Sequence, residues 1–367
     1  MKNRLAAFTI PLFLSFGIAT GPALAQDRLV IQRDVDTFAV LPDGVRHPEG
    51  IAANPANGDI YVATFDTGPN SNKLLRFSRN GHLVASRDFG VTPLLGLEFD
   101  RANKKVYILN VGDFVGTGSK IQRVAADLTQ LEDVAIIPPI GAPGPRFVIN
   151  PDDNPNSRSI DTITFGDNAR VPNAMVFDSR GNLYISDSFQ GAIFRIDDVA
   201  HCHTPCFVAT VAHDPLLATA GFPPFGANGL AFKNDSVLFV ANTGDDRVLE
   251  IDTKTGEVTA FAQSLNGADG LVFDSRSGLL WVATNQADEV VALNAHGKVV
   301  VKLGEFRGIN RNGTPDGLLF PASPVIVGDE IFVTNLAIAL TPTAGDEPEE
   351  DVTRWTISRM KLPDRKD

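Results

Sequence analysis

Four short segments of this 367-residue chain share a phrase in which one oxygen-bearing side chain stands at the start of an apolar strand. The segments read HPEGIA, PNAMVF, ANGLAF and ADGLVF, and their polar members are Glu49, Asn173, Asn228 and Asp269. Carboxylate and amide oxygens are the ligands that Ca²⁺ prefers, whereas Mg²⁺ demands a tighter octahedron with more retained water. Softer metals favour Cys and His, which none of the four positions holds. If the segments are copies of one unit, these side chains converge and predict a calcium site.

The phrase belongs to a repeat that occurs six times. The copies begin at Glu49, Leu95, Asn173, Asn228, Asp269 and Asp316. Each copy holds a short apolar strand, a turn, a second strand rich in Val, Ile, Leu and aromatic residues, and a third strand such as RVLEID. A period of about 40 to 55 residues with several strands per unit is typical of a β-propeller. The sequence therefore predicts an all-β, six-bladed β-propeller that occupies residues 26–367 as one domain.

In a propeller, equivalent positions of the six repeats form a ring around the axis. Five of the six starting residues carry a side-chain oxygen, and Leu95 is the exception. Closure of the ring predicts that residues 29–40 pair with the last unit near residues 354–362, because an open sheet would expose its edges. The sixth residue, Asp316, has three open interpretations: a second carboxylate beside the metal, a group that orients water, or a turn residue.

A simpler interpretation is that Asn or Asp before Gly makes the turn that enters each strand, a common use of these residues. It accounts for Asn228, Asp269 and Asp316, each of which precedes a glycine. It accounts poorly for Glu49, since Glu is not a turn former, and for Asn173, which precedes Ala174. The metal hypothesis is therefore favoured.

Residues 1–25 read as a secretory signal peptide. Lys2 and Arg4 precede the mostly apolar segment 5–18, and residues 23–25 (ALA) form a small-residue cleavage pattern. The alternative is a membrane anchor, but Pro11 interrupts the apolar segment, which is shorter than the ~20 residues needed to span a bilayer. We therefore expect a periplasmic or secreted protein without stable membrane insertion after signal cleavage. Its oligomeric state is not predicted.

The charge balance excludes a nucleic-acid partner. The formal net charge is −12, and no cluster of Lys and Arg forms a basic stripe. The chain also lacks a Gly-x-Ser-x-Gly nucleophile elbow and a dinucleotide-binding glycine fingerprint. A serine esterase and a nicotinamide enzyme are thus disfavoured.

Cys202 and Cys206 are the chain's two cysteines, in the stretch HCHTPC. An oxidising compartment favours a local disulfide between them. The alternative is a zinc site completed by His201 and His203, but the spacing fits no common zinc pattern.

Two connections are longer than the repeat allows, at residues 129–171 and 199–227. Long ordered loops in a compact fold are often lids or binding loops, and solvated excursions are the equally weighted alternative. Phe222 and Phe225, in the second connection, are apolar enough to line and roof a pocket.

The segments around Glu49, Asn173, Asn228 and Asp269 resemble the senescence marker protein/gluconolactonase/luciferin-regenerating-enzyme-like family. They resemble paraoxonases and diisopropyl fluorophosphatase more distantly. The resemblance implies a six-bladed propeller with calcium in the axial channel, held by a Glu of the first blade, an Asn of the third, an Asn of the fourth and an Asp of the fifth. Some relatives place a histidine near the metal, but no histidine falls on the six starting positions here.

The resemblance also implies an activity: hydrolysis of a small-molecule lactone or related ester. Calcium would polarise the carbonyl and Asp269 would activate water. A nucleophilic Asp269 that forms a covalent intermediate remains an open alternative.

Two rival functions have different requirements. A non-catalytic propeller would bind a protein or glycan through its loops, with any calcium structural, since the fold alone does not decide function. It would be favoured if the insertion at residues 141–160 plugged the site. A metal-free condensing enzyme like the alkaloid synthases is disfavoured by the intact ligand set.

Overall fold

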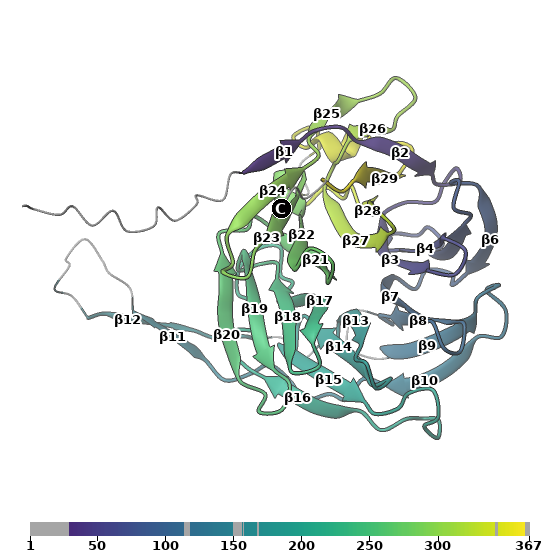
Figure 1. Cartoon of the computed structure of the whole chain (residues 1–367). Coiled ribbons are helices and arrows are strands. Elements are labelled where there is room, and N and C mark those ends of the chain that lie inside the picture. The colour runs from purple at the N-terminus through teal and green to yellow at the C-terminus, as the bar shows by residue number, and fades with distance from the viewer. Residues whose placement is uncertain are drawn as a thin grey trace, which may run out of the picture.

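The computed structural model describes residues 29–113, 118–149, 156, 158–166, 169–341 and 344–363. Within them, six sheets of four or five strands are arranged around a central axis (Figure 1). The regular helical segments described are two short 3₁₀ turns, η1 (Asn285–Ala287) and η2 (Pro348–Asp351). The prediction of an all-β, six-bladed β-propeller is confirmed.

Each blade runs from an inner strand beside the axis to an outer strand at the rim. The first blade comprises β3 (Pro48–Asn54), β4 (Asp59–Thr64), β5 (Lys73–Phe77) and β6 (Leu83–Asp88), and the second β7 (Leu94–Asp100), β8 (Lys105–Asn110), β9 (Lys120–Ala125) and β10 (Glu132–Ile136). The third comprises β13 (Pro172–Phe177), β14 (Leu183–Asp187), β15 (Ala192–Ile196) and β16 (Ala209–His213), and the fourth β17 (Ala227–Asn234), β18 (Val237–Asn242), β19 (Arg247–Asp252) and β20 (Val258–Gln263). The fifth comprises β21 (Ala268–Asp274), β22 (Leu279–Thr284), β23 (Glu289–Leu293) and β24 (Val299–Leu303).

The sixth blade closes the ring with strands from both ends of the chain. It comprises β27 (Pro321–Val327), β28 (Glu330–Asn335), β29 (Thr356–Lys361) and, at the rim, β2 (Asp36–Val40). β2 pairs antiparallel with β29, so the predicted closure is confirmed there. β1 (Val30–Gln32) differs from the prediction, because it pairs in parallel with β24 and extends the fifth blade. The N-terminal segment thereby covers the edges of two neighbouring blades.

Two small hairpins stand outside the blades. β11 (Arg146–Ile149) pairs with β12 (Ile160–Ile163), and β25 (Phe306–Ile309) pairs with β26 (Pro315–Gly317). The β11–β12 hairpin extends outward from the ring (Figure 1).

A β-bulge interrupts every inner strand near its start. The pairing shifts between Pro48 and Ile51, Leu94 and Leu97, Pro172 and Met175, Ala227 and Leu230, Ala268 and Leu271, and Pro321 and Pro324. A bulge leaves residues of one strand unpaired and changes the direction of their side chains. The first residue inside each bulge is Glu49, Leu95, Asn173, Asn228, Asp269 and Ala322, which we call the axial ring.

Small residues follow the ring positions because neighbouring inner strands approach closely. A Cβ on Gly50 would lie 2.2 Å from the carbonyl oxygen of Leu95, and one on Gly229 would lie 2.3 Å from that of Asp269. Both glycines lie inside strands β3 and β17, not in turns. The glycine in the phrase is therefore explained by contact between blades, and the turn interpretation is wrong for these positions.

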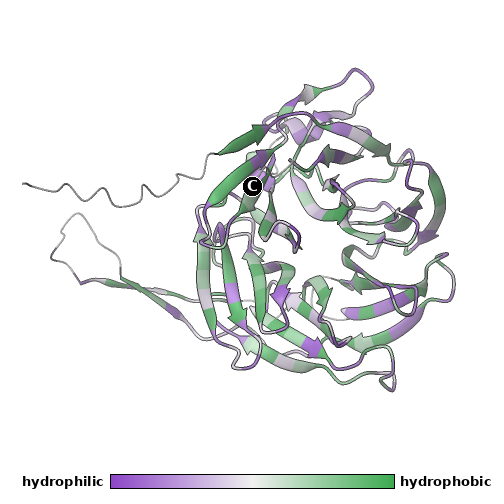
Figure 2. Ribbon diagram, in the orientation of Figure 1, coloured by the Kyte–Doolittle hydropathy of each residue, from purple (hydrophilic) through white to green (hydrophobic). Residues whose placement is uncertain are grey.

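Packing between blades repeats in the same way as the sequence. An aromatic residue of a second strand packs against one from the inner strand of the next blade, as in Tyr61–Phe99, Tyr107–Phe177, Tyr184–Phe232 and Phe239–Phe273. Apolar residues accordingly line the strands of each blade, and hydrophilic residues gather in the turns (Figure 2). The inner strands are thus held between apolar layers, which fixes the positions of their bulged residues.

Replacing Gly50 by alanine tests this close approach. The new Cβ would collide with backbone that cannot move aside, and such overpacking costs about 1–3 kcal/mol of folding free energy. We expect a lower denaturant midpoint for Gly50→Ala. Gly144→Ala is the matched control, because a Cβ there meets nothing within 4 Å. Equal midpoints for the two variants would contradict the explanation.

Candidate metal centre

The structure brings together the four oxygen-bearing residues of the repeated phrase. Glu49, Asn173, Asn228 and Asp269 start from four different blades, and each is at most 5% exposed. Glu49 and Asp269 lie near enough that the charge of one disfavours ionisation of the other. Residues up to 220 positions apart therefore share one buried site on the axis.

Several buried oxygens at this site have no hydrogen-bond donor. They are Glu49 Oε2, Asn173 Oδ1, Asp269 Oδ1 and Asn285 Oδ1. Buried polar atoms are normally paired, since leaving an acceptor without a partner costs free energy. All four are carboxylate or amide oxygens, and a hard cation would satisfy them together. The chemistry of this set fits calcium.

Hydroxyl groups fix the direction of the two amides. Asn173 Nδ2 donates to Ser188 Oγ over 2.9 Å, and that hydroxyl donates its single hydrogen to the Ala227 carbonyl over 2.8 Å. Because Ser188 has no second hydrogen to give, it must accept from the NH₂ group, which directs Asn173 Oδ1 away from it. Likewise, Asn228 Nδ2 donates to Thr243 Oγ1 over 2.9 Å, and that hydroxyl donates to the Ala268 carbonyl of the next blade over 2.8 Å. The amide oxygens are thus preorganised.

Asn285 is a site residue that the sequence analysis missed. It follows β22 directly, and its Nδ2 donates to Asp269 Oδ2 over 3.1 Å, which leaves Asp269 Oδ1 without a donor. Ser188 and Thr243 stand in the same place after β14 and β18. A polar residue 15 or 16 positions after a ring residue is the signal that would have found all three.

Burial dominates the electrostatics of the site. It raises the pKa of Glu49 well above the ordinary value, and the neighbouring Asp269 charge raises it further. Burial also raises the pKa of Asp269, and the neighbouring side-chain amides of Asn285 and Asn228 offset part of that effect. Two carboxylates in one low-dielectric site resist joint ionisation, and a bound divalent cation would relieve both effects.

Asp316 does not occupy the sixth ring position, so the prediction from the sixth repeat was wrong there. The inner strand of the sixth blade is β27, whose bulge places Ala322 in the ring. Asp316 lies in β26, where its side chain is 41% exposed and pairs with Arg307 at 2.7 Å. The β25–β26 hairpin precedes this blade, so the phrase PDGLLF resembles the repeat without occupying its position.

The two phenylalanines of the second long connection have different environments. Phe222 is 62% exposed, whereas Phe225 packs against Phe65 and Phe189, with ring centroids 6.4 and 5.7 Å away. Phe65 follows β4 and Phe189 follows Ser188, so both stand beside the ends of second strands, next to the ring. These three rings form an aromatic roof that joins the first, third and fourth blades, within the same apolar cluster as Leu95.

The other side of the ring is open. A cavity of about 1090 Å³ extends along the inner strands from Glu49, Asn173 and Asn228 to the turns at the opposite face. The described part of the 141–160 insertion does not plug the axis, because the β11–β12 hairpin extends outward (Figure 1). Arg146 at its base pairs with Asp245 at 2.5 Å.

Cys202 and Cys206 form a disulfide with Cα atoms 5.5 Å apart. Their sulfurs are joined to each other, so the alternative zinc site lacks its thiolates. Cys206 N donates to Val134 O over 2.8 Å, which attaches this loop to the second blade.

The expected signal peptide, residues 1–25, lies outside the described residues. Within the described ranges, no helix has the length and apolar character needed to cross a bilayer.

Comparisons with known proteins relate this chain to others through structure. No family profile and no curated protein matches its sequence. A luciferin-regenerating enzyme superposes with a TM-score of 0.54 at 15% identity, over 86% of this chain and 92% of its own. A calcium-binding protein, regucalcin from Agrobacterium tumefaciens str. C58, gives 0.54 at 15% identity, over 90% and 94%. Virginiamycin B lyase from Staphylococcus aureus gives 0.52 at 14% identity, over 90% and 99%.

At these identities the likeness establishes a shared propeller fold. The structural likeness to a luciferin-regenerating enzyme therefore supports the fold that the sequence motifs indicate.

The raised carboxylate pKa values predict how stability depends on pH. Between the ordinary and the raised pKa values, the folded state binds more protons than the unfolded state, so stability falls as pH rises through this window. We expect the Tm of calcium-free protein to fall from about pH 5 to about pH 8, and added calcium to raise Tm more at the higher pH. Calorimetry with and without chelator measures both effects. Glu49→Gln, which removes the repulsion, should show a shallower fall, and an identical pH dependence would contradict this assignment.

Proposed function

We propose that this chain is a periplasmic or secreted, calcium-dependent hydrolase of lactones or related esters. The observation that carries the proposal is the set of four buried oxygens without donors on the propeller axis, from Glu49, Asn173, Asp269 and Asn285. Asn228, fixed by Thr243, completes the group. Two carboxylates would balance the charge of one divalent ion, and the amide oxygens would fill further positions.

Bound calcium would supply Lewis-acid polarisation of the substrate carbonyl. The residues of the chain perform the remaining work. Asp269 Oδ1, which has no hydrogen-bond donor, accepts a proton from the attacking water while Asn285 holds Oδ2. The water oxygen adds to the acyl carbon, the acyl C–O bond breaks, and the proton passes to the leaving alkoxide. The products are a carboxylic acid and an alcohol, which remain one molecule when the substrate is a lactone.

The aromatic roof favours a substrate with an apolar acyl or alkyl group. Phe65, Phe189 and Phe225 belong to an apolar cluster that includes Val111 and Leu336. A sugar lactone carries several hydroxyl groups, and burying them against such a surface would leave hydrogen bonds unmade. Alkyl lactones and aryl esters are therefore the preferred substrate classes.

The alternative function, a non-catalytic propeller with structural calcium, requires a site that stays inaccessible. The described part of the 141–160 insertion, which would have closed it, extends away from the axis. Phe225 is the member of the roof that belongs to the long connection at residues 199–227, and movement of such a loop is compatible with opening. These features favour the hydrolase.

A hydrolysis screen with and without calcium tests the proposal. Sugar lactones, alkyl lactones, aryl esters and phosphotriesters are offered to the calcium-loaded protein and to protein treated with chelator. We expect calcium-dependent turnover of an alkyl lactone or aryl ester, and a loss in kcat of at least about 100-fold in Asp269→Asn, since it lacks the base. Asp316→Asn is the matched control and should keep full activity. Full activity of Asp269→Asn would remove this residue from the mechanism.

A single turnover in ¹⁸O-labelled water separates the two roles open to Asp269. As a general base it leaves the solvent oxygen in the product acid of the first turnover. As a nucleophile it would form a mixed anhydride with the acyl group, and water that attacks the Asp269 carbonyl of this anhydride would leave an unlabelled enzyme oxygen in that product. We expect the label in the first product, measured by mass spectrometry.

Phe225→Ala tests the role of the roof. The substitution removes the phenyl group above the site. It also removes apolar contact area, which is worth about 1.5–3 kcal/mol for a buried aromatic side chain. We expect KM to rise for long-chain lactones and to change little for short ones. The control is Phe222→Ala, whose exposed side chain should leave both values unchanged. An equal change in KM for both chain lengths would contradict an acyl-binding roof.

A further inference from the structure

Side chains line the axial cavity in layers, because the six inner strands run side by side. Three positions after the ring, the layer consists of Ala52, Glu98, Val176, Ala231, Val272 and Val325, all of which line the cavity. The next layer consists of Ala53, Phe99, Phe177, Phe232, Phe273 and Ile326. Among these twelve described residues, Glu98 is the one with a charge, and the proposed mechanism does not use it.

Glu98 has a fixed place on the wall of the cavity. Its Oε1 accepts a hydrogen bond from Phe99 N over 3.1 Å, and the exposed part of the side chain faces the cavity. Burial is the largest influence on its pKa, which it raises to about 7, with Asp100 adding to the shift and Arg101 opposing it. At a rise of about 3.3 Å per strand residue, three residues place it roughly 10 Å from the ring.

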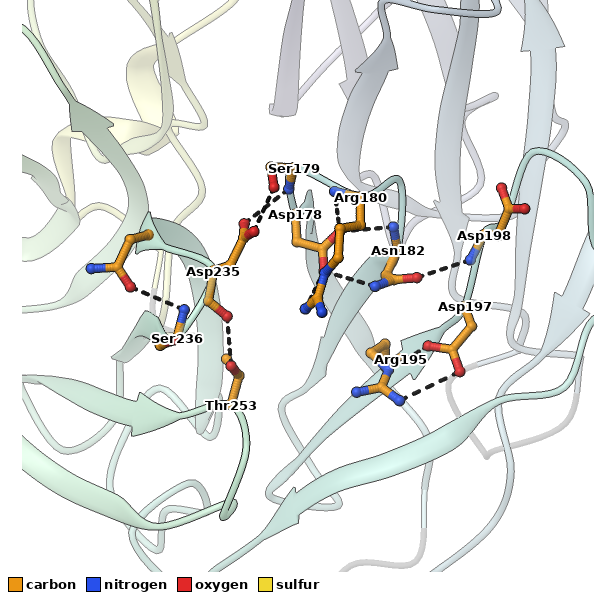
Figure 3. Close-up of polar contacts among 11 residues, drawn as sticks. Asp178, Ser179, Arg180, Asn182, Arg195, Asp197, Asp198, Asp235, Ser236 and Thr253 are labelled. Atoms are coloured by element: carbon orange, nitrogen blue, oxygen red, sulfur yellow. Dashed lines mark hydrogen bonds and ion pairs between the residues drawn. The ribbon is translucent and has the colours of Figure 1, made fainter.

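The far mouth of the cavity, at the turns, carries charges of both signs. Asp100, Asp178, Asp198 and Asp274 lie among its lining, together with Arg101, Arg180, Arg276 and His201. Figure 3 shows that Asp178 holds its own turn, where it accepts hydrogen bonds from Arg180 N and from Asn182. Asp100 does the same for Asn103. These carboxylates are engaged locally, so an ion that passes the mouth next meets Glu98.

Apolar groups lie on the opposite approach to the ring. Phe65, Phe189 and Phe225 pack together there, and a divalent cation that passed them would shed its water against carbon atoms. On the cavity side there is room for a hydrated ion and one carboxylate at an intermediate depth. Channels that conduct cations use rings of carboxylates at such depths, where binding must be strong enough to admit the ion and weak enough to release it.

We propose that Glu98 is a transit site through which the divalent cation of the axial ring enters and leaves by the turn-side cavity. This inference rests on the proposed metal centre. A lone carboxylate offers too few ligands to retain the ion, so it lowers the barrier between solvent and ring without competing for the bound state. Substrate and cation then use opposite faces of the propeller.

Release kinetics distinguish transit from simple long-range attraction. Without its transit site the ion should leave more slowly, because the barrier rises for exit as well as for entry. If Glu98 merely attracted the bound ion from a distance, its neutralisation would speed release. Calcium-loaded protein is mixed with excess fluorescent chelator Quin-2 at about pH 8, where a group with a pKa of about 7 is ionised. The rise in fluorescence gives the release rate.

We expect Glu98→Gln to release calcium at least about tenfold more slowly than wild type, since the lost attraction between a divalent ion and an adjacent carboxylate exceeds that factor. Glu98→Asp should stay near the wild-type rate. Glu250→Gln, an equivalent change on β19, is the control for a change in net charge.

Unchanged or faster release from Glu98→Gln overturns the transit role. Glu98→Met is a second neutral variant in case Glu98→Gln fails to fold. The release rate of either variant decides the question, provided that the variant keeps the wild-type circular dichroism spectrum. Calorimetric titration of wild type with calcium provides the separate check on the metal centre. No binding there would reject the proposed function itself, whereas normal binding with unaltered release in the variants rejects the transit site alone.

Discussion

The close contact between inner strands of neighbouring blades is the constraint on which the axial site depends. A Cβ at Gly50, Gly229 or Gly270 would lie within 2.6 Å of a backbone oxygen of the next blade. This contact favours glycine or another small residue directly after the ring position. It also brings the bulged residues of six strands around one axis, where side chains distant in the sequence become neighbours. Without that approach the oxygens would lie too far apart to share an ion.

Burying two carboxylates in the axial ring costs folding free energy, which packing elsewhere in the fold must offset. Glu49 and Asp269 are buried together, and both have raised pKa values. Hydroxyl and amide groups behind the ring, from Ser188, Thr243 and Asn285, hold the oxygens in place and do not neutralise them. Such preorganised, uncompensated charge is typical of sites built for a ligand and not for stability. The pH dependence of stability and the proposed binding of calcium would therefore report on the same pair of carboxylates.

The two faces of the ring differ in chemistry. An aromatic roof covers one face, and a cavity with a single carboxylate in its middle layers opens from the other. The apolar side chains of the roof lower the local dielectric constant, which strengthens electrostatic interactions at the site. The cavity keeps the axis accessible to a small charged species. The proposed hydrolase would use both properties, because apolar surroundings strengthen the polarisation of the substrate carbonyl and the cavity gives the metal a route to the centre.

The sequence by itself determined the fold class, the six repeats and the four ring residues Glu49, Asn173, Asn228 and Asp269. It could do so because strand periodicity and a recurring phrase are local properties of the chain. It misassigned the sixth ring position, since a hairpin with a similar phrase at Asp316 precedes the true strand.

Only the tertiary structure decided which side chains support, cover or approach the ring. Asn285 supports the ring through its hydrogen bond to Asp269 on the neighbouring strand. Phe225 packs against Phe65, which lies 160 residues earlier in the first blade. Glu98 gains its place from the alignment of six inner strands around a cavity. These relations arise from the closure of the ring and the packing of its blades. No stretch of sequence encodes them alone, because each depends on the positions of segments that meet only when the propeller is complete.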